Sequence, residues 1–183
     1  MTTKIKAGMA GGICSVVAII SIVLSMGNVR TSERGLELIG NAESCRRDPY
    51  VCPASVLTDG IGNTHGVKAG VIKTDAQIAA DWEKNILEAE RCVIRYANGS
   101  NLSQGAFDAA TSITFNAGCP SMQKSTMFQY FRTGNVIAAC EQFTRWVYGG
   151  GKKLPGLVAR RNQERLLCLN GELGRKLWGN SSK

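Results

Sequence analysis

The sequence has few of the residues that build metal sites. Its only histidine is His65, and none of its seven cysteines stands in a Cys-x-x-Cys pair. A zinc site would have to draw thiolates from distant parts of the chain, so we expect no metal and no other cofactor. Low-complexity tracts and internal repeats are also missing from the sequence. Their absence argues against a disordered chain, a solenoid or a propeller.

Positive charge is present, but it is not gathered into one stretch. The 22 lysines and arginines against 14 acidic residues give a net charge of +8. This balance suggests an acidic partner, such as nucleic acid, anionic lipid or the bacterial cell wall. Runs of five basic residues and basic stripes interleaved with aromatics do not occur, so nucleic acid is not expected. Solubility alone would explain the charge equally well.

Cysteine, by contrast, is abundant. Seven cysteines in 183 residues favour an oxidising compartment. Because seven is odd, at least one thiol must stay unpaired within a monomer, which is the oligomeric state that we expect. The cysteines are Cys14, Cys45, Cys52, Cys92, Cys119, Cys140 and Cys168.

The N-terminal region predicts a membrane segment. No residue from Ala7 to Val29 is charged, and a helix of about 17–25 such residues spans a bilayer. Lys4 and Lys6 precede it, which predicts that the N-terminus stays in the cytoplasm and the rest is exported. A cleaved signal peptide is the alternative. The stretch is long for that role, however, and Ser25-Met26-Gly27 is a poor cleavage site.

The predicted anchor is a weak one. Glycines, alanines and serines dilute its isoleucines and valines, and such residues contribute little to membrane insertion. Gly8 and Gly12 form a GxxxG pair, a pattern that more often marks helix packing. A helix able to leave the bilayer would bring Cys14 out with it.

The exported part predicts an α+β fold. Arg30 to Gly40 is expected to form a short helix capped by Thr31 or Ser32. Cys45 to Gly70 is rich in glycine and proline, as in a small antiparallel sheet with tight turns. Thr74-Asp75-Ala76-Gln77 matches a capping box at the start of a long helix.

That long helix should end at Asn98-Gly99. Its buried stripe is predicted from apolar residues at steps of three and four: Ile78, Trp82, Ile86, Ala89, Val93 and Tyr96. Further helices are expected at about Ser103–Asn116, Ser125–Arg132, Val136–Val147 and Gly156–Leu169. We therefore expect an anchor segment (1–29) and one domain (30–183), the latter divided into a small α+β lobe (30–73), a connecting helix (74–97) and a helical lobe (98–183). Such an arrangement leaves a cleft between the lobes.

Glu43 is a candidate catalytic acid at the junction of the first predicted helix and the turn-rich segment. Hydrolysis of a glycosidic bond needs a carboxylic acid and a second group that directs water or attacks the sugar. A lone glutamate is more often an ordinary surface residue. Here, however, Glu43 is followed by eight residues, Cys52, five residues, Thr58 and then Gly60-Ile61-Gly62.

This pattern resembles the phage-type lysozymes (endolysins, glycoside hydrolase family 24). Their motif is Glu, eight residues, Asp or Cys, five residues, Thr and a Gly-x-Gly turn. Further segments resemble that family in the expected order: Phe115–Gly118, Gly149–Lys152, Gly156-Leu157 and Arg160–Glu164. The chain is most similar to the signal-anchor-release endolysins, which combine a weak anchor carrying a cysteine with a cysteine at the usual Asp position.

The resemblance implies a lysozyme-like fold and an inverting N-acetylmuramidase. Such an enzyme hydrolyses the β-1,4 bond between N-acetylmuramic acid and N-acetylglucosamine in peptidoglycan. Glu43 would be the general acid, and Cys52 and Thr58 would position or activate water. Asp48 could share that role, although it also fits a turn residue. Residues that could contact substrate or support the site are Asp59, Asn63, His65, Arg160 and Arg161.

Two positions depart from the pattern of the family. Asn63 stands where relatives have histidine, and Leu57 stands where many have tryptophan. These departures put a supporting hydrogen bond in doubt and leave the proposed triad unaffected.

The cysteines suggest a switch. While Cys14 sits in the bilayer, Cys45 and Cys52 can form a disulfide that consumes the Cys52 thiol. After release, Cys14 can attack Cys45 by thiol–disulfide exchange and set Cys52 free. The resemblance implies the same sequence of events. Cys92, Cys119, Cys140 and Cys168 are expected to be structural partners, and three pairings among them stay open.

The expected location follows from this switch. Host export machinery would place the inactive enzyme on the host inner membrane, held by residues 7–29 and facing the periplasm. Release would leave it active in the periplasm, with peptidoglycan as its partner. The alternatives are a membrane-tethered wall-binding protein without catalysis, a lytic transglycosylase and a cysteine protease using Cys52 and His65.

Overall fold

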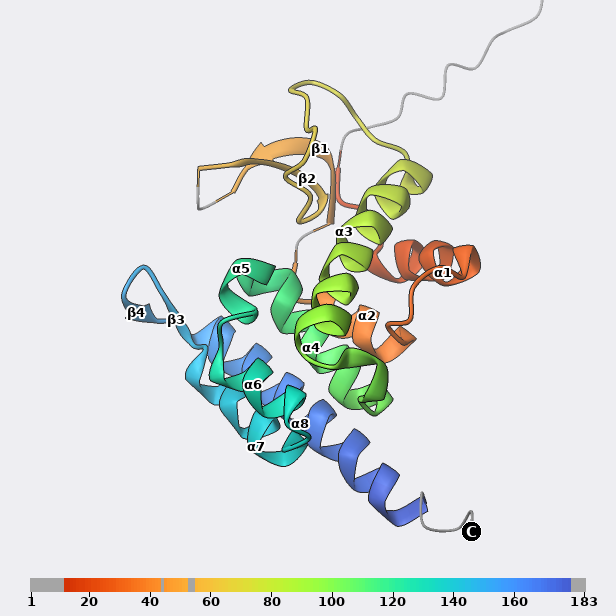
Figure 1. Ribbon diagram of the computed structural model, residues 1–183. Helices are drawn as coiled ribbons and strands as arrows, with labels where there is room; N and C mark the ends of the chain where they lie inside the picture. The colour runs from red at the N-terminus through yellow and green to blue at the C-terminus, as the bar shows by residue number, and fades with distance from the viewer. Residues whose placement is uncertain (1–11, 44, 53–54, 179–183) are drawn as a thin grey trace, which may run out of the picture.

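The computed structural model describes residues 12–43, 45–52 and 55–178. The described helices are α1 (Val16–Met26), α2 (Glu33–Gly40), α3 (Asp75–Tyr96), α4 (Gln104–Ala117), α5 (Cys119–Met122), α6 (Thr126–Arg132), α7 (Val136–Glu141) and α8 (Pro155–Trp178), with 3-10 turns η1 (Gly99–Asn101) and η2 (Gln142–Arg145). Two antiparallel hairpins complete the fold: β1 (Cys45–Val51) with β2 (Leu57–Ile61), and β3 (Tyr148–Gly149) with β4 (Lys152–Lys153). The predicted α+β, lysozyme-like fold class is confirmed (Figure 1).

Helix α3 connects the two lobes. Its predicted capping box is confirmed, because the Gln77 amide donates to Thr74 Oγ1 and the Gln77 side chain accepts from the Thr74 amide. The helix ends before Asn98, which adopts a left-handed conformation with φ of 55°. Trp82 lies in the core of the small lobe and Val93 in that of the helical lobe. The helix therefore fixes the separation of the lobes on either side of the cleft.

Helices α4 and α8 form the centre of the helical lobe. They cross at Gly105 and Gly171, where a Cβ atom on Gly105 would overlap the Leu167 carbonyl and lie 3.0 Å from Gly171 Cα. Side chains larger than hydrogen at this crossing would push the helices apart. Their close approach brings Ser112 of α4 beside Arg160 of α8.

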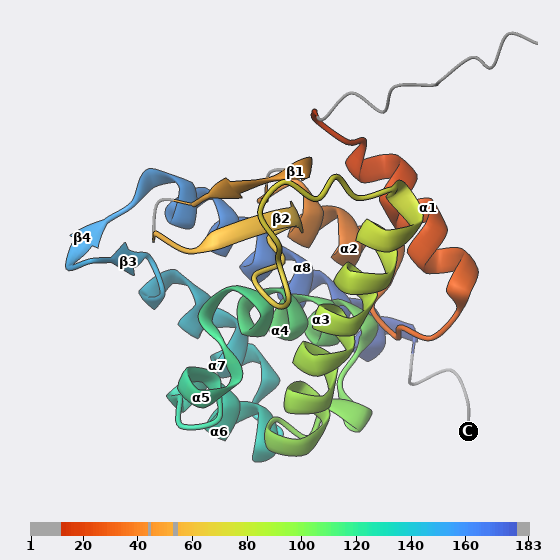
Figure 2. The same cartoon turned by 90° about the horizontal axis from the view of Figure 1, so that it is seen from above.

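Helix α1 completes the core of the small lobe. Ile19, Ile20 and Val23 are buried among residues of α2 and α3, and Figures 1 and 2 show α1 beside α3 and at a wide angle to it. Ser15 caps the helix by accepting from the Ala18 amide, and Gly27 ends it with φ of 71°. The burial of aliphatic side chains stabilises this docked position by roughly 1.5–3 kcal/mol for each fully buried one.

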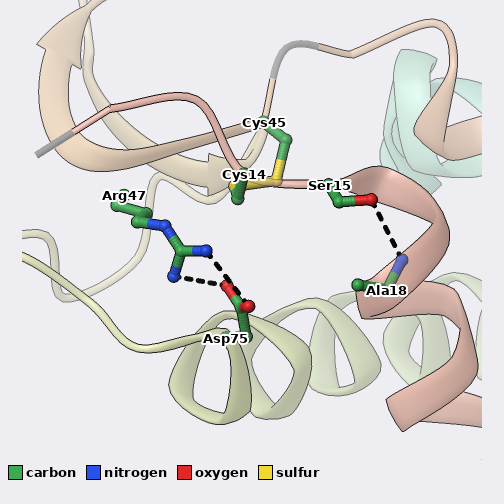
Figure 3. The surroundings of a disulfide bond; sticks show 6 residues. All are labelled: Cys14, Ser15, Ala18, Cys45, Arg47 and Asp75. Carbon is green, nitrogen blue, oxygen red and sulfur yellow. Dashed lines mark hydrogen bonds and ion pairs between the residues drawn. A yellow bond between two sulfur atoms is a disulfide. The ribbon is translucent and has the colours of Figure 1, made fainter.

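The segment before α1 pairs with β1. The Arg47 amide donates to the Gly12 carbonyl at 2.9 Å, and the Cys14 amide donates to the Cys45 carbonyl at 3.0 Å. A disulfide joins Cys14 to Cys45. Figure 3 shows this bond next to the Arg47–Asp75 ion pair, which ties β1 to the start of α3. The N-terminal segment is thus fixed to the strand that leads into the candidate site.

The predicted membrane segment, residues 7–29, begins outside the described residues, since residues 7–11 are not among them. Within the described ranges, no helix has both the length and the apolar character needed to cross a membrane.

Two details of the predicted helices were wrong. The helix predicted for Val136–Val147 ends at Glu141 and continues as η2, because a 3-10 turn keeps the i, i+3 spacing that buries Phe143. The helix predicted to end at about Leu169 extends to Trp178. The prediction that Thr31 or Ser32 caps the first helix is confirmed: Ser32 caps α2, while the Thr31 hydroxyl donates to Glu90. The short elements α5, β3 and β4 were not predicted.

Candidate active site

Glu43 lies in the turn that leaves α2. Its amide donates to the Gly40 carbonyl at 3.2 Å, which continues the helical turn and fixes the direction of the chain. The side chain is 24% exposed, and its Oε1 forms an ion pair with Arg160 Nη1 at 3.0 Å. Opposite stands Gly62, with φ of 68°, where a Cβ atom would come within 3.2 Å of Glu43 Oε2. Glycine at this position therefore leaves room for the carboxylate.

Cys52 and Thr58 lie on the β1–β2 hairpin. Tyr50 pairs with Thr58 and Val51 with Leu57, so Cys52 directly follows the last paired residue of β1. The Cys52 amide donates to the Val56 carbonyl at 2.9 Å, and the Thr58 hydroxyl donates to the same carbonyl at 3.0 Å. The hydroxyl oxygen of Thr58 keeps its capacity to accept a hydrogen bond.

Tyr50 lies on β1, two residues before Cys52. Burial raises the pKa of Tyr50, the charges of Glu43 and Cys52 raise it further, and Arg46 lowers it. The strand register shifts between Arg46 and Tyr50, and such irregularities change the direction in which a side chain points.

Arg160 and Arg161 reach the site from the first half of α8. Arg160 is 6% exposed and binds Glu43 with Nη1, Glu164 with Nε and the Ser112 carbonyl with Nη2. Arg161 is buried and donates from Nη2 to Asn116 Oδ1 at 2.7 Å. Burial lowers the pKa of Arg161 to about 10, and the neighbouring Arg160 adds to this effect, while Glu164 opposes it.

Asp59 and Asn63 lie in a buried network beside the site. Asp59 is 1% exposed and forms an ion pair with Lys73 at 2.7 Å. Asn63 donates to Asp59 Oδ1 at 2.9 Å and accepts from the Asn85 side chain at 3.2 Å. Asn63 thus still joins the β2 turn to α3, in the place where the family pattern has histidine. The network holds the β1–β2 hairpin against α3.

Two hollows lie near Glu43. One, of about 580 Å³, is lined by Glu43, Asn116, Leu157 and Arg160 among others. The second, of about 200 Å³, is lined by Gly62, His65 and Phe115 among others. The Glu43 carboxylate thus lines the first hollow and lies against a glycine that lines the second.

The disulfides use six of the seven cysteines. Cys14 pairs with Cys45. The structure assigns the pairing that the sequence left open: Cys92 with Cys119, and Cys140 with Cys168. Cys52 is the seventh and stays outside these bonds as a thiol.

Comparison with known proteins identifies the family. The model of the phage lysozyme family matches residues 40–164. The chain belongs to the phage lysozyme family. Within this family, the SAR-endolysin of Escherichia phage P1 is 50% identical over 182 residues, covering 93% of this chain and 98% of the relative. The SAR-endolysin of Haemophilus phage HP1 is 37% identical and covers 76% of this chain and 81% of the relative.

Two solved structures of the P1 phage endolysin Lyz resemble this chain to different degrees. The active form of the P1 phage endolysin Lyz is 49% identical, with a TM-score of 0.85 over 89% of this chain and 98% of that chain. The secreted inactive form of the same endolysin has a TM-score of 0.57 over 78% of this chain and 97% of that chain. The present fold is therefore more similar to the active form.

Several residues of the site were not predicted from the sequence. Tyr50 was not singled out, and Ser112 gave no signal of its own because its partner Glu164 lies 52 positions away. Asn116 was noted only as part of the Phe115–Gly118 segment, and its partner Arg161 lies 45 positions away. Glu164 was noted only as part of the C-terminal signature of the phage lysozyme family. Its burial between two arginines could have been suspected from the spacing Arg160-Arg161-x-x-Glu164, which places all three on one helix face.

Proposed function

We propose that the protein is an endolysin that hydrolyses the β-1,4 bond between N-acetylmuramic acid and N-acetylglucosamine in peptidoglycan and thereby lyses the host. Residues 30–183 act as the lysozyme domain, and residues 1–29 as a separable anchor. The enzyme works as a monomer.

The observation that carries this proposal is the position of Glu43. Its carboxyl lines one hollow, lies against a glycine that lines a second, and forms an ion pair with a buried arginine. A glycan strand lying in both hollows would present its linking oxygen to Glu43. The acid protonates that oxygen as the bond breaks. His65 and Phe115 line one hollow, and Asn116 and Leu157 the other, so they are the residues that we expect to contact sugar.

Cys52 and Thr58 supply the second function that hydrolysis requires. The thiolate of Cys52 takes a proton from the attacking water, and the Thr58 hydroxyl orients that water by accepting or donating a hydrogen bond. Strand β2, which carries Thr58, leads into Gly62, and Gly62 lies against the Glu43 carboxylate; this supports placing the hairpin residues and the acid around one bound sugar.

The same proposal includes control by the anchor. Host export machinery inserts residues 7–29 into the inner membrane, and a Cys45–Cys52 disulfide keeps the tethered enzyme inactive on the periplasmic side. After release, Cys14 displaces Cys52 from Cys45. The Cys14–Cys45 bond, the thiol of Cys52 and the greater similarity to the active form of the P1 endolysin support the released state for the present structure.

A clearing assay on purified murein tests the catalytic part. Wild-type protein is expected to clear a murein suspension, whereas Glu43→Gln and Cys52→Ser are expected to lose at least a hundredfold in rate while keeping the fold. Mass spectrometry of the fragments should show reducing N-acetylmuramic acid ends. Anhydro ends, lighter by one water, would identify a transglycosylase, and activity in Glu43→Gln would refute the assigned acid.

Timed lysis of host cells tests the control by the anchor. Cys14→Ser should stay inactive after release, because Cys45 keeps Cys52 in a disulfide. Cys45→Ser should be active too early. Cys140→Ser serves as the control, since its disulfide lies in the helical lobe and it should not change the timing. Normally timed lysis by Cys14→Ser would refute the exchange.

A further inference from the structure

Glu164 lies buried behind the candidate acid. Its side chain is fully buried; Oε1 is hydrogen-bonded, while Oε2 has an ion-pair partner and no hydrogen bond. Oε1 accepts from the Ser112 hydroxyl at 2.6 Å and from Arg160 Nε at 3.2 Å. Oε2 lies 3.0 Å from Arg161 Nη1. Arg160 in turn holds Glu43, so Glu164 acts on the acid through one guanidinium group.

We infer that Glu164 is a positioning residue of the hydrolysis: its buried negative charge fixes Arg160 and offsets the two guanidinium charges, so that Glu43 can hold its proton at the pH of catalysis. This inference deepens the proposed function and rests on the assignment of Glu43 as the general acid.

The need for such a residue follows from the charge of Arg160. A guanidinium beside a carboxyl group favours the ionised carboxylate, but a general acid has to be protonated when the substrate binds. Arg160 alone would therefore orient Glu43 and also remove its proton. A negative charge on the far side of Arg160 lets Arg160 keep Glu43 oriented while favouring its ionised form less strongly.

Geometry favours an ionised Glu164. The pKa of Glu164 is raised overall, because burial outweighs the opposing effects of Arg161, Arg160 and the Ser112 hydroxyl; the ionised form is inferred from its contacts. A neutral Glu164 would leave two buried guanidinium groups with only the partly exposed Glu43 carboxylate to compensate them. Burying unpaired charge of that kind is strongly unfavourable. The Ser112 hydroxyl, which donates to Oε1, also matches a carboxylate.

The charged surroundings of Glu164 are few. Helix α8 contributes Arg160 and Arg161, and the turn after α2 contributes Glu43. On α4, Asp108 lies one turn before Ser112 and is bound by Ser32 and Gln104. Arg34 and Glu37 of α2 line a separate open hollow beside α8. Among the described residues, the two arginines and Glu164 set the charge balance on the α8 side of Glu43, while Tyr50, Cys52 and Arg46 face it from the β1–β2 hairpin and are unchanged in all the variants below.

The test is the pH profile of kcat on soluble, un-cross-linked murein glycan, measured with the full-length protein released from the membrane. Glu164→Gln keeps the shape of the side chain and removes its charge. We expect the basic limb of its profile to move to lower pH by about one unit or more, with kcat reduced and KM within about twofold of the parent value. Glu164→Asp keeps the charge, and its basic limb should stay near that of the parent.

Two further variants test whether the net charge of the cluster sets the position of the basic limb. Arg161→Gln removes a positive charge from the same cluster, and its basic limb should move to higher pH. The double variant Arg161→Gln/Glu164→Gln restores the net charge and should return the limb to the parent position. Glu172→Gln, which changes another buried glutamate of α8, is the control and should leave the profile unchanged.

These outcomes separate the inference from the proposed function. If the profiles of Glu164→Gln and the parent coincide, or if Arg161→Gln shifts in the same direction as Glu164→Gln, the inference is refuted. Should Glu164→Gln not fold, the shift of Arg161→Gln still decides it. Failure of the proposed function shows differently, as activity in Glu43→Gln.

Discussion

Gly40 offers a direct test of how α1 docks on the body of the enzyme. A Cβ atom at this position would lie 2.6 Å from Val16 Cγ1 and 3.4 Å from Cη2 of Trp82. Overpacking of this kind costs about 1–3 kcal/mol, partly offset by the gain of up to about 1 kcal/mol when alanine replaces glycine in a helix. We therefore expect Gly40→Ala to lower the free energy of unfolding by roughly 0.5–2 kcal/mol.

The cause can be isolated with a double-mutant cycle. Val16→Ala removes the methyl group that the new side chain would strike, so the double variant should be more stable than the sum of the single changes predicts. We expect a coupling energy of about 1–2 kcal/mol. Urea denaturation of the oxidised proteins measures it. Gly174→Ala is the control, because a Cβ atom there meets nothing within 4 Å.

Docking can also be read from the disulfides. The Cys14–Cys45 bond forms where the docked segment pairs with β1. Weaker docking should therefore lower the equilibrium constant for exchange of a Cys45–Cys52 disulfide into the Cys14–Cys45 disulfide. Each 1.4 kcal/mol corresponds to a factor of ten in that constant. Gly40→Ala should therefore reduce the ratio of the two bonds by roughly 2- to 30-fold in a glutathione buffer, as measured by peptide mass spectrometry. Additive energies, together with an unchanged ratio, would refute the packing argument.

Three other predictions concern the rest of the fold. Lys73→Met should cost about 3–5 kcal/mol, because it leaves Asp59 buried without its ion pair. Burial alone would lower the pKa of Lys73, but hydrogen bonds from its ammonium to two carboxylates raise it. The stability contributed by Lys73 should thus be fully present below the ordinary pKa of lysine and lost as the pH rises through the raised pKa of Lys73. Unfolding of the parent protein and of Lys73→Met at alkaline pH checks this sign. Cys140→Ala, which opens the loop closed by Cys168, should lower stability by roughly 3–4 kcal/mol in thermal unfolding under oxidising conditions. Gly105→Ala should destabilise by more than about 1 kcal/mol in urea, since the added methyl group meets backbone rather than a movable side chain.

Local signals in the sequence predicted local structure well. The capping box at Thr74 and Gln77 was identified correctly because all its atoms lie within one turn of helix. The turn-rich segment correctly predicted the β1–β2 hairpin. The helix expected at Val136–Val147 was wrong beyond Glu141, where a 3-10 turn follows, since α-helical and 3-10 turns both bury residues three positions apart.

Long-range contacts could not be predicted in the same way. Arg160 and Glu43 are 117 positions apart, and only family resemblance suggested that they meet. The pairing of Cys92 with Cys119 depends on how α3 lies against α5, which no local pattern encodes. The role of Glu164 could not be predicted, because the sequence does not show that its carboxylate is buried or which arginines it meets.

The exposed side of α1 bears on the proposed release of the anchor from the membrane. Ser21 and Ser25 face outward, and their hydroxyls donate to the carbonyls of Val17 and Ile22 in the same helix. A hydroxyl that bonds its own helix needs no water, so lipid can tolerate it. The same serines keep that face polar when the helix lies on the protein. If the helix is released as proposed, replacing both serines with leucine should favour its lipid-bound position and leave the enzyme on the membrane.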